Sequence, residues 1–295
     1  MKFTNFIIGF QLIVGALCAS RNIEVWMNTA KQWATDVCDI LEPYVYAPNT
    51  PPNDRIMQLA TRIFGANDID TMFDVYRRFN MIRYYTEWSG TFDTKDPGWK
   101  QTRDNGDLEI YCNADHIIQR SDSVDGGVTY WDTTREEWIS NDDPLLDLKD
   151  PSSVTVAVTS PAKPDGNQLE FPENWSEYMA FNPSRLQTTV EKGNIFDDNT
   201  VAKALSPSLL RRIQRRNARA GNTMCQIDIL NTLTHLVRCG ASEDLLDTGS
   251  YGWHHIREIQ STNNAENLAY FAMIIQLQRT YKLDVDDDGN IVEFD

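Results

Sequence analysis

Apolar residues recur at spacings of three and four positions at both ends of the chain, and this periodicity limits the possible folds more than any other feature. The helices that it predicts cover residues 23–41, 55–64, 69–84, 224–237, 251–260 and 265–281. Pro43 and residues 47–52 are predicted to end the first of them. The predicted apolar face of the third consists of Met72, Phe73, Tyr76, Phe79 and Ile82.

The middle of the chain has a different character. Alternating apolar and polar residues predict short strands at 108–112, 128–131 and 154–158. Residues 133–200 are rich in Asp, Asn, Pro and Ser, which indicates long surface loops with short elements between them. We find no internal repeat and no clear linker. The sequence therefore predicts an α+β fold, mainly helical, with a small sheet and a loop-rich insert at 133–200 in a single domain over residues 21–295.

The first 20 residues have the layout of a secretory signal peptide. Lys2 precedes an apolar stretch from Phe6 to Leu17, and small residues follow it at 18–20. The stretch is shorter than the roughly 20 apolar residues of a membrane-spanning helix, and no later segment is long and apolar enough. We therefore expect a secreted protein with no membrane span.

In a secreted protein, cysteines can form disulfides and an asparagine in a sequon can be glycosylated. The cysteines that would remain after cleavage are Cys38, Cys112, Cys225 and Cys239. An even number in an oxidising compartment predicts two disulfides, with three pairings open. If Cys225 and Cys239 close one loop, Cys38 pairs with Cys112. Asn174 begins an Asn-Trp-Ser sequon, which predicts a glycoprotein.

The charge of the chain excludes some partners. Its 27 Lys and Arg against 43 Asp and Glu give a net charge of −16. Nucleic acid and anionic membrane surfaces attract basic patches, so neither is expected as the main partner.

Three segments of the last quarter carry a family resemblance. They are Leu230-Asn-Thr-Leu-Thr-His235, Ser250-Tyr-Gly-Trp253 and Asn263-Asn-Ala-Glu-Asn-Leu-Ala-Tyr-Phe-Ala272. Together they resemble the C-terminal half of the fungal aspzincin metallopeptidases, the deuterolysin and lysine-specific metalloendopeptidase group, and a related group of secreted antigens with an HRxxH motif. The resemblance implies a zincin-like fold.

The resemblance ends at the residues that carry the chemistry. The family's HExxH helix binds zinc through two His one turn apart, and its Glu activates the metal-bound water. Here Asn231 stands at the first His and Thr232 at the Glu, and only His235 remains. An amide is a poor zinc ligand, and Thr is no base at neutral pH. The position of the family's Asp ligand holds Thr248 beside Asp247, which would ligate only after a one-residue shift.

The family's Tyr, which is thought to stabilise the oxyanion, corresponds to Tyr251. A replacement metal site could use His254 and Glu258, one helical turn apart, with His255 and His235. The alternative is an amphipathic helix in which Trp253 and Ile256 are buried and the His and Glu side chains are solvated.

The acidic tail has the layout of a calcium loop. Asp284, Asp286, Asp288 and Asp295 occupy EF-hand positions one, three, five and twelve. The motif has Glu rather than Asp at position twelve, and no exiting helix follows the loop. An acidic turn that leads into an extended stretch around 291–294 is the alternative.

The sequence thus favours a secreted, catalytically inactive metalloendopeptidase-like protein that binds a peptide, a protein or a host or cell-wall surface without a cofactor. One alternative is an active zinc metalloendopeptidase with a rearranged site. The other is an extracellular protein that binds zinc or calcium.

Overall fold

The computed structural model describes residues 27–47, 49–50, 52–84, 108–111, 114–120, 129–133, 137–141, 143–150, 157–159, 177–182, 233–235, 242, 253–289 and 291–293. The chain divides into two compact units. One comprises Met1–Asn22 and Gly90–Glu191, and the other comprises Ile23–Ser89 and Lys192–Asp295. The single domain expected over residues 21–295 stays a prediction.

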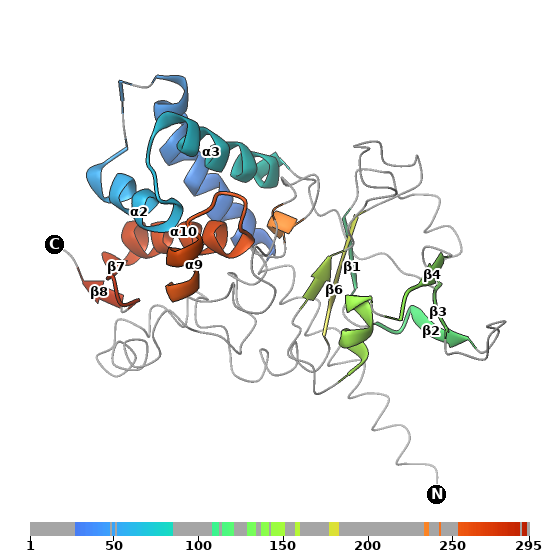
Figure 1. Ribbon diagram of the computed structural model, residues 1–295. Helices are drawn as coiled ribbons and strands as arrows, with labels where there is room; N and C mark the ends of the chain where they lie inside the picture. Colours follow the sequence, from blue (N-terminus) through green and yellow to red (C-terminus); the bar gives the residue numbers. More distant parts are fainter. Residues whose placement is uncertain are drawn as a thin grey trace, which may run out of the picture. The chain divides into compact units, whose positions relative to one another are not determined.

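The second unit is mainly helical (Figure 1). It contains a helix over residues 27–46, α2 (Asp54–Phe64), α3 (Ile69–Tyr84), α9 (Trp253–Ile259), α10 (Ala265–Gln276), a π-helical turn η3 (Leu277–Tyr281), and the hairpin strands β7 (Leu283–Val285) and β8 (Ile291–Glu293). Nearly every residue of α10 is buried. Both α2 and β7 pack against α10, and the rings of Phe64 and Phe271 lie 5.0 Å apart. This apolar helix is therefore the centre of the helical core.

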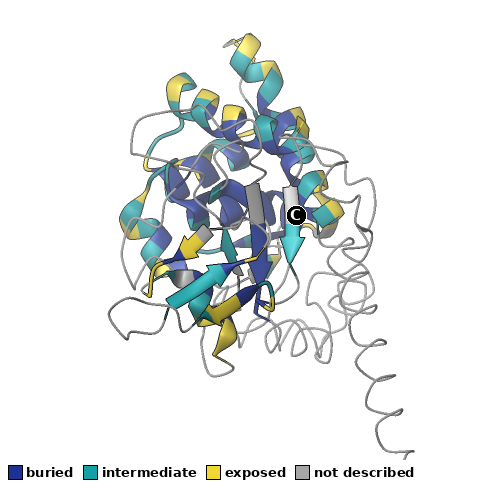
Figure 2. Cartoon of the chain, turned by 90° about the vertical axis from the view of Figure 1, so that its right-hand side faces the viewer, coloured by how far each residue is buried: buried dark blue, intermediate teal, exposed yellow. Residues whose placement is uncertain are grey.

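Local signals explain the bounds of α2. The side chain of Asn53 accepts a hydrogen bond from the backbone N–H of Ile56 at 3.1 Å, which caps the first turn. Gly65 adopts the left-handed conformation with φ 75° and ends the helix. Figure 2 shows that the buried residues of the helices face the interior and that their exposed residues lie on the outer turns.

Two details of the predicted helices are wrong. The first helix continues past Pro43 to residue 46. The proline has no N–H to donate to the preceding turn, but its ring holds φ at a helical value and its own carbonyl accepts the N–H of Ala47 at 3.0 Å. Phe73, predicted on the buried face of α3, is 48% exposed, and Val75 is buried instead. The bounds of α2 and α3 confirm the predicted helices.

The first unit contains short strands in two sheets. One sheet has the order β1 (Leu108–Tyr111), β6 (Glu177–Phe181), β5 (Ala157–Thr159), with β1 and β6 parallel. The other is an antiparallel sheet of β2 (Ile117–Arg120), β3 (Thr129–Asp132) and β4 (Glu137–Ile139). A 3-10 helix η1 (Pro144–Lys149) follows β4.

The apolar cluster of this unit consists of Ala114, Ile117, Ile139, Leu145, Leu148 and Ala180. Helices and small sheets together confirm the predicted α+β class. Among the helices that the structure describes, none has both the length and the apolar character to cross a bilayer.

Candidate functional site

His235 is the one histidine of the expected zinc helix, and its ring is held by the backbone. The structure describes residues 233–235 of that helix, and Leu233 and Thr234 are buried. The Nδ1 atom of His235 lies 2.9 Å from the carbonyl oxygen of Ser242, whose own N–H donates to the carbonyl of Thr234 at 3.0 Å. Because a carbonyl only accepts, Nδ1 carries a proton, and in the neutral ring Nε2 carries the lone pair.

This arrangement is the one that orients a metal-binding histidine, whose second nitrogen usually donates to a carbonyl or carboxylate. The other expected site positions, Asn231, Thr232, Asp247, Thr248 and Tyr251, lie outside the described residues. The structure therefore gives the orientation of one imidazole of the expected site.

The helix α9 matches the amphipathic alternative that the sequence left open. Trp253 and Ile256 are buried, at 1% and 0% exposure. His254 and Glu258 are exposed, and Oε2 of Glu258 lies 3.8 Å from Nδ1 of His255. Within the described part of the chain, no group of three or more His, Cys, Asp or Glu side chains lies close enough together to hold a metal ion.

The start of α10 joins three helices through buried amides. Asn267 is fully buried, and its Nδ2 donates to the carbonyl of Ile63 at 2.6 Å and to that of Ile256 at 2.9 Å. The Nδ2 of Asn264 lies 2.6 Å from Oδ1 of Asn267. The segment from Asn263 to Ala272 therefore ties α10 to the last turn of α2 and to α9.

A second polar junction lies beside the first. The carboxylate of Asp74 accepts a hydrogen bond from Thr262 at 2.6 Å and pairs with Arg77 and Arg78 at 3.0 and 3.3 Å. Arg78 also donates to Asn263 at 3.0 Å. Burial alone would raise the pKa of Asp74, but these donors together hold that pKa below its ordinary value. Sequence reasoning missed this junction, whose only signal is the polar run before α10.

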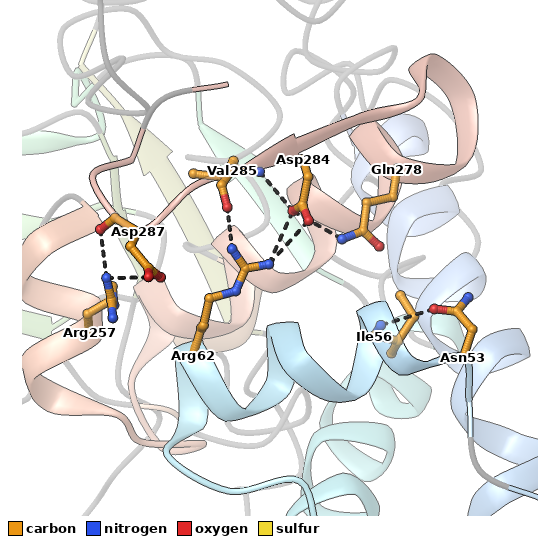
Figure 3. Close-up of polar contacts among 8 residues, drawn as sticks. All are labelled: Asn53, Ile56, Arg62, Arg257, Gln278, Asp284, Val285 and Asp287. Carbon is orange, nitrogen blue, oxygen red and sulfur yellow. Dashed lines mark hydrogen bonds and ion pairs between the residues drawn. The ribbon is translucent and has the colours of Figure 1, made fainter. Parts of the chain in front are cut away.

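The acidic tail forms a hairpin whose first carboxylate is held by Arg62 (Figure 3). Asp284 pairs with Arg62 at 3.2 Å, accepts a hydrogen bond from Gln278 at 3.1 Å and accepts another from the N–H of Val285 at 2.8 Å. Arg62 also donates to the carbonyl of Val285. A cation at this position would compete with the guanidinium for the Asp284 carboxylate.

The turn of the hairpin packs against α9. The carbonyl of Asp287 accepts from Nε1 of Trp253 at 3.0 Å and from Arg257 at 2.6 Å. Asp286 accepts from the N–H of Asp288 at 3.0 Å, and Gly289 completes the turn with φ 82°. The hairpin confirms the extended stretch expected near 291–294, while Asp295 lies outside the described residues, so calcium binding stays a prediction.

Cys38 is a buried free thiol, whereas the sequence predicts it in a disulfide. Its Sγ lies 4.0 Å from the carbonyl oxygen of Tyr76, and burial raises the pKa of the thiol to about 12. The periodicity explains this place, because Cys38 occupies the core face of the first helix. The other cysteines, Asn174 and the expected signal peptide fall outside the described residues.

A pocket of about 750 Å³ lies elsewhere in the helical unit. It is lined by Asp39, Ile40, Asn53, Asp54, Arg55, Ile56, Gln278, Arg279 and Lys282. Two of these charges are already compensated, since Arg279 pairs with Asp36 at 3.1 Å and Asp39 pairs with Arg83 at 3.4 Å. The lining has no single sign of charge that would select a ligand.

Comparison of the chain with family models, with curated proteins and with solved structures gives no match.

Proposed function

We propose that the chain is a secreted, catalytically inactive metalloendopeptidase-like protein that binds a peptide or protein ligand without cleaving it. The observation that carries the proposal is the pattern around His235, where Asn231 and Thr232 stand at the positions of a zinc ligand and a general base. A hydrolytic zinc site needs three protein ligands and a base for the metal-bound water. This segment offers one imidazole.

The helical frame supports the same proposal. Asn264 and Asn267 hold α10 to α2 and α9 through hydrogen bonds of 2.6 to 2.9 Å between buried groups. These bonds keep the helices in place, while an amide and a hydroxyl stand at the positions of the zinc ligand and the base. Such a frame is suited to binding a peptide without hydrolysing it.

The test is hydrolysis of unfolded casein by the purified mature protein with added zinc. We expect no activity above that of the His235→Ala variant. The triple variant Asn231→His, Thr232→Glu, Thr248→Asp should gain zinc affinity, and His235→Ala in that background should remove it. Zinc-dependent hydrolysis by the unaltered protein that His235→Ala abolishes would overturn the proposal.

A second candidate, an active zinc enzyme with a rearranged site, is favoured by one observation. The 2.9 Å contact between Nδ1 of His235 and the Ser242 carbonyl fixes the tautomer that a zinc-bound histidine uses. In that case the unaltered protein binds zinc, and His235→Ala loses both metal and activity.

A further inference from the structure

An apolar row crosses the outer face of the sheet β2–β3–β4. Trp131 lies directly opposite Ile118 on one side and Trp138 on the other, so the three side chains share one face. The adjacent positions Ile117 and Ile139 belong to the buried apolar cluster, which lies on the opposite face. Trp138 is 53% exposed and Ile118 is 37% exposed. The sheet thus buries one face and presents apolar side chains on the other.

A cation lies over this row. Arg120 is two residues from Ile118 on β2 and therefore points to the same face. The central carbon of its guanidinium lies 4.9 Å from the ring centroid of Trp131 and 6.0 Å from that of Trp138. Indole rings attract a cation in this position and hold it in place.

The charge of Arg120 is not neutralised within the part of the chain that the structure describes. No acidic side chain there pairs with its guanidinium, although Asp and Glu outnumber Lys and Arg by 43 to 27. A guanidinium has five N–H donors in a fixed planar fork that suits a carboxylate. We call these residues the Trp–Arg face: Ile118, Arg120, Trp131 and Trp138. It thus combines a guanidinium that has no carboxylate partner in the described part of the chain with exposed apolar area.

We infer that the Trp–Arg face binds an extended peptide segment of a partner protein in which a carboxylate and an apolar side chain stand two residues apart. In an extended chain such side chains lie on one side, about 6.8 Å apart. That spacing matches the 6.0 Å between the guanidinium and the ring of Trp138. The carboxylate meets Arg120, and the apolar side chain meets Trp138.

The composition of the face favours a protein partner. Trp and Arg are the residues most enriched among those that dominate protein interfaces. A net charge of −16 repels polyanions but tolerates a single carboxylate at short range. The rings of Trp131 and Trp138 are inclined at 73°, so they do not form one flat platform for a row of sugar rings. This inference concerns the sheet-containing unit and does not rest on the proposed function.

The probe is the peptide acetyl-Ser-Phe-Ser-Glu-Ser-amide, titrated into the full mature protein while the indole N–H signals are followed by NMR. The Trp138 signal is identified as the one missing in Trp138→Phe. We expect saturable shifts of that signal, a Kd raised about tenfold or more by Arg120→Gln, and a smaller rise in Arg120→Lys, which keeps the charge and loses the fork. Trp138→Ala should weaken binding similarly.

Matched controls separate binding from nonspecific effects. The exposed residues of α3 provide Arg77→Gln and Phe73→Ala, which should leave the Kd unchanged. Probes with Gln in place of Glu, or with Phe and Glu adjacent, should bind about tenfold more weakly because they lose the fork contact or the shared side.

Three results overturn the inference. They are the absence of saturable shifts of the Trp138 signal, equal binding of the Glu and Gln probes, and a Kd unaffected by Arg120→Gln when the NMR spectrum of that variant shows the wild-type fold. Any of them would mean that Trp131 and Trp138 only stabilise the sheet and bind no peptide. Binding of an oligogalacturonate instead of the peptide also contradicts the inference, since the partner is then a carbohydrate.

Discussion

Replacing Asn267 by Ala should be the most destabilising single polar substitution at the start of α10. Ile63 lies in the last turn of α2, where no further helical N–H reaches its carbonyl, so Asn267 supplies its donor at 2.6 Å. Asn264 loses an acceptor at 2.6 Å in the same step. Ile256 is less affected, because its carbonyl keeps the N–H of Gln260 at 3.0 Å.

The magnitude follows from these bonds. A buried polar group that loses its partner costs about 1–3 kcal/mol. The Ile63 carbonyl loses its donor outright and Asn264 loses one of its bonds, so the free energy of unfolding should fall by about 2–4 kcal/mol. Urea denaturation followed by far-UV circular dichroism measures it. The matched control is Asn67→Ala, which loses one half-buried bond of 3.3 Å to the Met57 carbonyl and should cost about 1 kcal/mol or less. Equal losses in the two variants would refute the reasoning.

Three further predictions concern the turn, a carboxylate and the thiol. Gly289→Ala should lower the thermal midpoint of unfolding more than Gly65→Ala. Both glycines have positive φ, but a Cβ at Gly289 would lie 2.7 Å from Cδ1 of the buried Trp253, whereas a Cβ at Gly65 would meet the movable end of Gln260 at 3.0 Å. Equal midpoints in the two variants would refute the role of the Trp253 contact. Because the folded pKa of Asp74 is lowered, its stabilisation is present above the ordinary value of 3.8 and is lost as pH falls below it. The stability advantage over Asp74→Asn should therefore shrink in urea titrations between about pH 5 and pH 2, and a constant difference would contradict this sign. Cys38, with its pKa raised to about 12, should resist iodoacetamide at pH 8 and react after unfolding in urea, as read by peptide mass spectrometry; rapid labelling of the native protein would show that the thiol is accessible.

The helices with local signals could be predicted from the sequence. The apolar period of α2 is bounded by the cap at Asn53 and the glycine at position 65. The apolar period of α3 begins after Asp68, whose carboxylate accepts a hydrogen bond from the N–H of Thr71 at 2.9 Å and caps the first turn. Phe73 is exposed although the period places it near the core, because its position lies at the margin of the buried stripe.

The remaining elements depend on residues far apart in the chain. Strand β6 was not predicted, since it is defined by parallel pairing of Glu177 with Leu108 rather than by its own pattern. The same holds for the polar junctions, where Asn267 reaches a carbonyl 204 residues away. The resemblance identified the segment but not this structural role, because a sequence pattern does not show which buried acceptors an amide will meet.

The zinc content of the mature protein shows whether the site around His235 lacks the ligands for a catalytic metal. The protein is dialysed without chelator, and zinc and calcium are measured by elemental mass spectrometry beside the His235→Ala variant. The proposal predicts far less than one zinc per chain and the same value in both proteins. About one zinc per chain that His235→Ala removes would contradict it and establish a rebuilt metal site.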